Sequence, residues 1–259
     1  MPIITLTTDW NKDDYYLAAI KGQLNGLCPG VNIVDISHQV PSFNVRHAAF
    51  LIKNSYSHFP DGTIHIIGVN STSVSKPRFL MISVDKQYFL SYDTGIFGLL
   101  FKDEPKEVIE IKTEDTNQVT FPELTVFARI ACEIVQGKKM SELGKTTSKF
   151  TKTIPLRAAI DELTITGSVI FIDSYRNAIT NITRELFDRI GLGRKFEISI
   201  QSDHYKVKKI NSNYGETTMG ELLAIFNSID LLEIAINRGN AADLLGLSTN
   251  SVVRVKFME

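Results

Sequence analysis

The first 150 residues alternate between short β-branched runs and segments with helical periodicity, and this alternation limits the folds open to the chain. It predicts strands at 3–8, 32–36, 63–69, 79–84 and 88–90, and helices at 14–24, 44–55 and 126–135. Strands that alternate with helices are typical of layered α/β domains, in which helices cover a largely parallel sheet. We therefore expect an N-terminal α/β domain over residues 1–150, built on a largely parallel sheet.

The pattern changes after a segment rich in Thr, Ser and Lys at 145–155, which ends in Ile154 and Pro155. Such composition is typical of an exposed connection between domains. Beyond it, strands are predicted at 163–173, 195–199, 204–210 and 252–257, with one short helix at 185–190. This pattern predicts a smaller C-terminal domain over residues 156–259, built as a mostly antiparallel β-barrel or sandwich.

Charge and hydropathy exclude several classes of partner. The chain has 259 residues and a formal net charge of -1, without a basic stripe, so neither nucleic acid nor anionic membrane is an expected partner. Its apolar runs are shorter than the ~20 residues of a membrane helix, and its N-terminus lacks the features of a signal peptide, so we expect a cytoplasmic protein. Cys28 and Cys132 lie far apart in apolar contexts, which favours two reduced core thiols over a disulfide or a metal site.

Asp9 directly follows the first apolar run, and an amphipathic segment follows it. In open α/β sheets, ligands bind beyond the carboxyl ends of the strands, which makes Asp9 a candidate binding residue. Asp is also a favourable helix N-cap. The spacing alone therefore fits a ligand-binding Asp9 and a helix-capping Asp9 equally well.

Four separated segments of the sequence resemble one known family. They are residues 3–10 with Asp9; residues 33–50, which begin Ile-Val-Asp-Ile-Ser-His; residues 173–182, Asp-Ser-Tyr-Arg-Asn-Ala-Ile-Thr-Asn-Ile; and residues 232–242, Leu-Glu-Ile-Ala-Ile-Asn-Arg-Gly-Asn-Ala-Ala. In this order they resemble the S-adenosylmethionine hydroxide adenosyltransferase family, whose relatives include fluorinating and chlorinating enzymes. The resemblance covers nearly the whole chain. It implies an α/β domain followed by a β-barrel, S-adenosylmethionine as substrate or ligand without a further cofactor, and a homotrimer with sites between subunits.

The resemblance also assigns residues to parts of the ligand. Asp9 matches a carboxylate that accepts both ribose hydroxyls in charge-assisted hydrogen bonds. Asp173 and Asn177 match a pair that holds the methionine ammonium, although an Asx-turn between the two side chains stays open as an alternative. The other matched positions are Phe43 and Phe121 beside the nucleoside, with core packing as their alternative, Ser73 in the loop at 69–75, Ser228 at the methionine carboxylate, and Ile236, Asn237 and Arg238 at the adenine edge.

The positions that activate water in the hydrolases of this family differ in this chain. Asn70 stands at the family's Asp position, and Pro122 stands at its His position. Pro77 stands at the Arg position, with Arg78 beside it as a candidate replacement. Asn cannot accept a proton, and general-base assistance is typically worth ~10²–10⁴-fold in rate.

Glu123 is the one plausible replacement for the lost base, because it aligns beside the missing His. A carboxylate there would repel a halide ion, so halogenation is not expected. The alternative is that Glu123 is an exposed residue in the first turn of a helix, where acidic residues are favoured. Asp93 lies in an altered family turn and is expected to set turn geometry.

The sequence therefore predicts hydrolysis of S-adenosylmethionine to adenosine and methionine at an altered water-activating site. Glu123, Asn70 and Arg78 are the candidate catalytic residues. The alternative is a catalytically weak or inactive binder of adenosine or S-adenosylmethionine.

Overall fold

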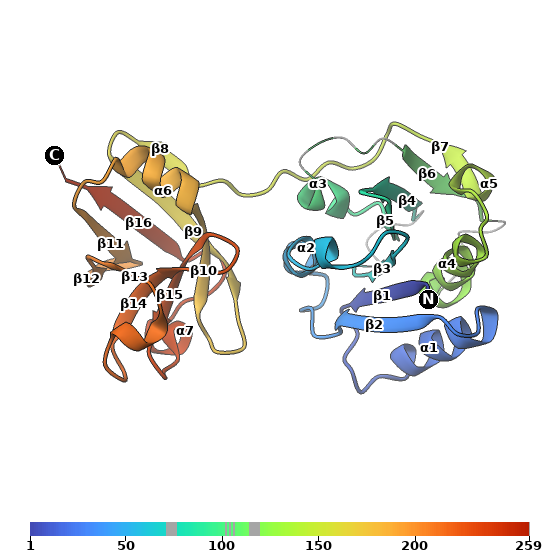
Figure 1. The fold of residues 1–259 in the computed structure, drawn as a ribbon, viewed down its shortest axis with the longest axis horizontal. Helices are drawn as coiled ribbons and strands as arrows, with labels where there is room; N and C mark the ends of the chain where they lie inside the picture. The colour runs from blue at the N-terminus through green and yellow to red at the C-terminus, as the bar shows by residue number, and fades with distance from the viewer. Residues whose placement is uncertain (71–76, 102, 104, 106, 114–119, 259) are drawn as a thin grey trace. The chain divides into compact units, whose positions relative to one another are not determined.

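The computed structural model describes residues 1–70, 77–101, 103, 105, 107–113 and 120–258. Ser73 lies outside these residues. The chain forms two compact units, Met1–Pro155 and Leu156–Glu259 (Figure 1).

A mixed sheet forms the centre of the N-terminal unit. Over the described residues it has seven strands in the order β2-β1-β3-β5-β4-β6-β7. Their bounds are β1 (Ile3–Thr8), β2 (Asn32–Ser37), β3 (Ile64–Gly68), β4 (Phe79–Val84), β5 (Gln87–Tyr92), β6 (Glu107–Ile111) and β7 (Gly144–Thr146). The first four strands in the order pair in parallel, whereas β4 pairs antiparallel with β5 and β6, and β7 antiparallel with β6. Only β4 and β7 run against the others, which confirms the predicted largely parallel sheet.

Helices cover both faces of this sheet (Figure 1). One face packs against α1 (Tyr15–Leu27), the π-helical segment η3 (Glu123–Phe127), α4 (Ala128–Val135) and α5 (Met140–Leu143). The other face packs against α2 (Val45–Lys53), which the 3-10 turn η1 (Tyr56–His58) follows, and α3 (Ile96–Leu100). Phe79 and Met81 of β4 belong to the first core, while Leu80 and Ile82 belong to the second, because successive strand residues face opposite sides of a sheet.

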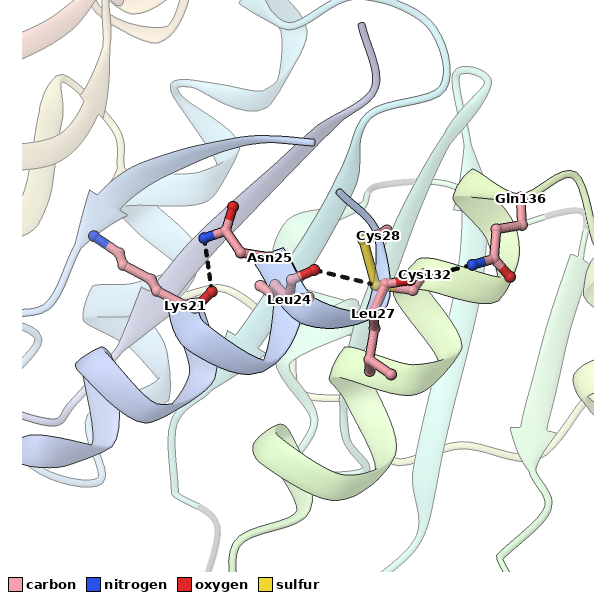
Figure 2. Close-up of a disulfide and its surroundings, with 7 residues drawn as sticks. All are labelled: Lys21, Leu24, Asn25, Leu27, Cys28, Cys132 and Gln136. Atoms are coloured by element: carbon pink, nitrogen blue, oxygen red, sulfur yellow. Dashed lines mark hydrogen bonds between the residues drawn. A yellow bond between two sulfur atoms is a disulfide. The ribbon is translucent and has the colours of Figure 1, made fainter. Parts of the chain in front are cut away.

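The two cysteines form a disulfide, so the prediction of reduced core thiols is wrong (Figure 2). Cys28 follows the last residue of α1, and Cys132 lies within α4; their Cα atoms are 5.5 Å apart although 104 residues separate them in the sequence. The side-chain amide of Gln136 also donates a hydrogen bond to the Leu27 carbonyl at 3.3 Å. The prediction failed because the spacing of the cysteines did not show that α1 and α4 pack side by side.

The C-terminal unit is a nearly closed, barrel-like sheet, as predicted. Over the described residues its strand order is β12-β11-β16-β9-β10-β15-β14-β13, with β8 also paired to β9. All pairings are antiparallel except that of β13 with β14. The elements are β8 (Ala159–Asp161), β9 (Thr164–Ile172), β10 (Ala178–Thr183), α6 (Arg184–Gly191), β11 (Phe196–Ile200), β12 (Ser202–Val207), β13 (Ile210–Asn211), η4 (Tyr214–Glu216), β14 (Leu222–Phe226), β15 (Leu231–Ile236), α7 (Ala241–Leu244) and β16 (Val252–Phe257).

A large apolar core fills this second unit, with contributions from the strands, α6 and α7, and Leu223, Ile225 and Ala235 form a second, small cluster. Within the part of the chain that the structure describes, no helix has the length and apolar character needed to cross a membrane.

Candidate active site

The carboxyl ends of β1, β3 and β5 lie side by side at one edge of the parallel part of the sheet (Figure 1). The strand register pairs Thr8 with Gly68, and Ile67 with Ser91. Asp9 and Tyr92 therefore stand at the same edge. Because ligands of open α/β sheets bind beyond such strand ends, this edge is the candidate site of the N-terminal unit.

Asp9 holds two loops together at this edge. Its Oδ2 accepts the backbone N–H of Phe43 at 2.8 Å and that of Asn70 at 3.2 Å. Both residues have a left-handed backbone, with φ of 65° and 60°, which non-glycine residues adopt at a cost. Asp14 occupies the N-cap position of α1, so the helix-capping alternative for Asp9 is wrong. Among the described residues, Oδ1 of Asp9 accepts no hydrogen bond, which leaves one carboxylate oxygen for a ligand.

Glu123 is buried, so the alternative of an exposed residue is wrong, although Glu123 does begin the helical segment η3. Its side chain is 1% exposed and lies against Gly68, the last residue of β3. A β-carbon added to Gly68 would lie 2.8 Å from Glu123 Oε1 and 3.0 Å from Trp10 Cζ2. Glu123 Oε1 has no hydrogen-bond partner within the described part of the chain. An unsatisfied buried oxygen is uncommon in a native structure, and a catalytic role or a bound water would each explain it.

The surroundings of Glu123 favour its protonated form. Burial raises the pKa of Glu123 to about 7, because a carboxylate loses hydration when it leaves water. The backbone N–H of Glu123 and the nearby Tyr92 side chain lower this pKa, while the negative charge of Asp9 raises it further. A carboxyl group that titrates near neutral pH is suited to general-base work. Single-turn π-helical segments are also frequent at functional sites.

Aromatic rings gather beside this carboxyl group. Phe121 packs edge-on against Trp10, with ring centroids 5.0 Å apart, and against Tyr16, at 5.2 Å. Phe43, by contrast, is 62% exposed, and its ring is available to a ligand or a neighbouring surface. The sequence identified Phe43 and Phe121 only through the family resemblance, and it missed Trp10 and Tyr16. The placement of Trp10 directly after Asp9 was the available signal.

Arg78 forms ion pairs with acidic side chains. Its guanidinium lies 2.7 Å from Asp93 Oδ2 and 2.8 Å from Glu110 Oε2, and it also donates to the Lys149 carbonyl at 3.0 Å. Asp93 in turn accepts the backbone N–H of Thr151 at 2.7 Å. Through Arg78 and Asp93, these contacts connect the start of β4 and the end of β5 to residues 149–151, which lie shortly before Pro155. Arg78 is consequently a weaker catalytic candidate than Glu123.

In the C-terminal unit, Asp173 and Asn177 contact each other. The backbone N–H of Asn177 donates to Asp173 Oδ1 at 2.8 Å, and its side-chain amide donates to Oδ2 at 3.1 Å. Because the bonded N–H lies four residues after Asp173, this is a local turn contact and not an Asx-turn, which would use the N–H two residues on. It also fixes the direction of a carboxylate in the turn between β9 and β10, which is compatible with a ligand role.

Glu233 is a buried carboxyl group near this pair that the sequence analysis missed. It is 3% exposed and accepts hydrogen bonds from the Tyr214 hydroxyl at 2.7 Å and the Asn227 amide at 3.1 Å. Burial raises the pKa of Glu233, and the negative charge of Asp173 raises it further. The sequence feature that could have revealed Glu233 was a single acidic residue inside the otherwise apolar run of β15.

The other residues assigned to the ligand lie in turns of the same unit. Ser228 is exposed in the turn between β14 and β15. Ile236 is the last residue of β15 and borders the turn of Asn237 and Arg238, in which the Asn237 side chain donates to the Thr217 carbonyl at 2.6 Å. The N–H of Ala242 donates to the Arg176 carbonyl at 2.8 Å, so the turn at 173–177 packs against the start of α7.

Family models match most of the chain. Residues 4–144 match the SAM hydroxide adenosyltransferase N-terminal domain, and residues 167–254 match the C-terminal domain of the same family. The chain belongs to the SAM hydroxide adenosyltransferase family.

Curated relatives of this SAM hydroxide adenosyltransferase family member include hydrolases and halogenating enzymes. It is 26% identical over 264 residues to an (R)-S-adenosyl-L-methionine hydrolase of Thermus thermophilus, covering 96% of this chain and 97% of the relative. The corresponding hydrolase of Methanocaldococcus jannaschii is 28% identical, covering 95% of this chain and 93% of the relative. A fluorinase of Actinoplanes sp. is 21% identical, covering 78% of each chain.

The fold also matches solved structures. An uncharacterized conserved protein from Thermotoga maritima superposes with a TM-score of 0.87 at 24% identity, covering 98% of this chain and 99% of that one. This similarity supports the two-unit fold of the SAM hydroxide adenosyltransferase family.

Proposed function

We propose that the protein hydrolyses S-adenosylmethionine to adenosine and methionine, with Glu123 as the general base. The observation that carries the proposal is the buried Glu123 carboxyl group, which has an unpartnered oxygen and a pKa of about 7. It lies close enough to Asp9 for the Asp9 charge to raise its pKa. The family membership and the hydrolase relatives supply the substrate and the reaction class.

In the proposed reaction, a water oxygen forms a bond to C5′ of the nucleoside as the bond between C5′ and sulfur breaks. The electron pair of that bond goes to the methionine sulfur, which leaves as a neutral thioether and needs no protonation. One proton of the attacking water passes to Glu123, as expected of a base whose pKa lies near the working pH. Desolvation and orientation of the water lower the barrier further.

Asp9 binds the ribose hydroxyls in this proposal. Its Oδ2 is held by two backbone N–H groups, so the carboxylate is oriented before a ligand arrives. Such preorganisation reduces the entropy lost on binding. Phe43 and Phe121 flank the nucleoside, Asp173 and Asn177 hold the methionine ammonium, and Ser228 contacts the methionine carboxylate. Backbone atoms of Ile236, Asn237 and Arg238 contact the adenine edge.

We further infer a homotrimer whose active sites are shared between neighbouring subunits. The family resemblance supports it, and cyclic symmetry lets one heterologous interface repeat until it closes. The 62% exposure of Phe43 is consistent with a surface that a ligand or a neighbouring chain covers.

The decisive experiment incubates purified protein with S-adenosylmethionine and follows adenosine and methionine by chromatography. Glu123→Gln keeps the shape of the side chain but cannot take up a proton, so its rate should fall by at least ~10²-fold. Glu107→Gln is the matched control, because Glu107 is an exposed glutamate on β6, and its rate should equal that of the native protein. A parallel incubation with chloride tests for 5′-chloro-5′-deoxyadenosine, which should be absent because Glu123 repels halide.

The competing function is a binder of adenosine or S-adenosylmethionine with little or no turnover. The preserved carboxylate of Asp9 and the neutral Asn70 beside it favour this alternative. Tight binding measured by calorimetry, with no adenosine formed over many hours, would reject hydrolysis and leave the binder.

A further inference from the structure

Glu233 lies on the face of its sheet that points away from the large apolar core of the C-terminal unit. Leu232 and Ile234, its neighbours on β15, belong to that core, and successive strand residues face opposite sides of a sheet. Glu233 is nevertheless 3% exposed. Its partners in the strand register, Ile179 of β10 and Ile225 of β14, are also buried. A carboxyl group buried on an apolar face loses hydration, and hydrogen bonds must compensate for this loss.

One oxygen of this carboxyl group fixes the turn between β14 and β15. Glu233 Oε2 accepts the side-chain amide of Asn227 at 3.1 Å. The side-chain oxygen of Asn227 then accepts the backbone N–H groups of Ile229 and Leu231, both at 3.2 Å. The first of these bonds closes an Asx-turn, because the donor lies two residues after Asn227. Ser228 lies inside this turn, so Glu233 orients the amide that shapes the backbone around Ser228.

The other oxygen holds the segment that contacts the turn after β15. Glu233 Oε1 accepts the Tyr214 hydroxyl at 2.7 Å. Tyr214 begins η4, and its carbonyl accepts the Thr217 hydroxyl at 3.4 Å. The Thr217 carbonyl in turn accepts the side-chain amide of Asn237 at 2.6 Å. Residues 214–217 therefore link Glu233 to Asn237.

We propose that Glu233 is a positioning residue, whose two carboxyl oxygens place the turn of Ser228 and the turn of Asn237 for the two ends of the ligand. This inference rests on the proposed function, in which Ser228 contacts the methionine carboxylate and Asn237 borders the adenine edge. Glu233 itself does not contact the ligand, because it is buried and both of its oxygens accept hydrogen bonds within the protein. A buried group that orients both turns before binding reduces the entropy lost when the ligand is held at both ends.

Calorimetry with two ligands tests this proposal. Adenosine carries only the adenine end, whereas S-adenosylhomocysteine carries both ends and lacks the sulfonium leaving group. Tyr214→Phe removes the hydroxyl that donates to Glu233 and should weaken both ligands by the same factor, roughly threefold to tenfold, as expected for one hydrogen bond. Glu233→Leu removes both acceptors, so it should weaken adenosine by a similar factor and S-adenosylhomocysteine by a further threefold to tenfold, roughly the effect of a second hydrogen bond.

Two further variants serve as controls. Glu233→Gln should recover most of the affinity that Glu233→Leu loses, because its oxygen accepts the Asn227 amide while its amide donates to the Tyr214 hydroxyl oxygen. Tyr205→Phe is the matched control for Tyr214→Phe. Tyr205 lies on β12 of the same unit and is 44% exposed, against 42% for Tyr214, so its loss should leave both affinities at the native values.

The ratio of the two affinities separates positioning from a general effect on the C-terminal unit. A general loosening of this unit weakens both ligands by one factor, so an unchanged ratio in folded Glu233→Leu would overturn the proposal. If Glu233→Leu does not fold, Asn227→Ala tests the turn of Ser228 by itself. S-adenosylhomocysteine should then bind more weakly and adenosine as before, and any other result would equally overturn the proposal.

These measurements need no turnover, which separates the inference from the hydrolysis reaction. A native protein that forms no adenosine but shows the expected ratios would reject hydrolysis and support the role of Glu233. A native protein that binds neither ligand would reject the proposed function and the role of Glu233 with it.

Discussion

Replacing Glu123 by Gln should stabilise the N-terminal unit at alkaline pH and change its stability little at acid pH. Burial raises the pKa of Glu123 from its ordinary value of 4.5 to about 7, so the folded protein binds this proton more tightly than the unfolded chain. The stability that comes from the protonated group is fully present below the unfolded value and is lost as the pH rises through the folded value. Gln does not titrate, and the variant should not show this loss.

The size of the effect follows from the same two values. Each pKa unit corresponds to about 1.4 kcal/mol, so the gap between 4.5 and about 7 amounts to about 3 kcal/mol. The free energy of unfolding of the native protein, minus that of Glu123→Gln, should fall by this amount from about pH 4.5 to about pH 8. In the difference between the two free energies of unfolding, the contributions of titrating groups that both proteins contain cancel.

Urea unfolding at a series of pH values measures this difference. The fluorescence of Trp10, the one tryptophan in the sequence, reports the N-terminal unit, because its ring lies against Gly68 and Phe121. Glu107→Gln serves again as the exposed control, and its difference from the native protein should not vary with pH. A pH-independent difference for Glu123→Gln would show that Glu123 titrates normally in the folded protein, and the argument for a general base would lose its main support.

Three other measurements test separate parts of the molecule. Asp9→Ala should weaken binding of adenosine or S-adenosylmethionine by ~1.5–3 kcal/mol in calorimetry, as expected for hydrogen bonds to a charged group, and unchanged affinity in a folded variant would remove Asp9 from the site. Light scattering at micromolar concentration should give three times the mass of one chain, and a monomer would contradict shared sites. The double variant Cys28→Ser with Cys132→Ser should lose about 4–5 kcal/mol of unfolding free energy, as loop-closure entropy predicts for a closed loop of this length, and an equal urea midpoint would argue against the disulfide.

The fold class could be predicted because hydrophobic periodicity and the positions of turn residues are local properties of a sequence. The elements at 3–8, 79–84 and 252–257 have the predicted bounds. Short elements were missed: β7 has three residues and β13 has two, too few for a periodic pattern. Strands β10 and β15 were identified only as parts of the family's signature segments and were not predicted as strands. The polar residues that made these segments recognisable also obscured the alternation of apolar and polar positions along each strand.

The candidate site was harder to predict, because it depends on contacts between distant segments. Asp9 was identified from its place after a strand. Its bonds to Phe43 and Asn70, however, join residues 34 and 61 positions away. The burial of Glu123 depends on the absence of a side chain at Gly68, and the ion pairs of Arg78 depend on Glu110 from another strand. None of these pairings can be predicted from the residues that neighbour each position in the sequence. The same holds for the two cysteines.

The disulfide turns much of the N-terminal unit into a covalent ring. Strands β2 to β6 and Glu123 lie between Cys28 and Cys132, whereas β1 and Asp9 precede the ring and β7 follows it. A protease that cuts the backbone once between the two cysteines therefore releases no fragment from the oxidised protein. The cut chain migrates as one species until a reductant is added, and only then do two pieces separate. If the cut lies between Cys28 and Glu123, the two carboxylates of the proposed site would then lie on different fragments, so reduction of this cut protein should separate ribose binding from water activation.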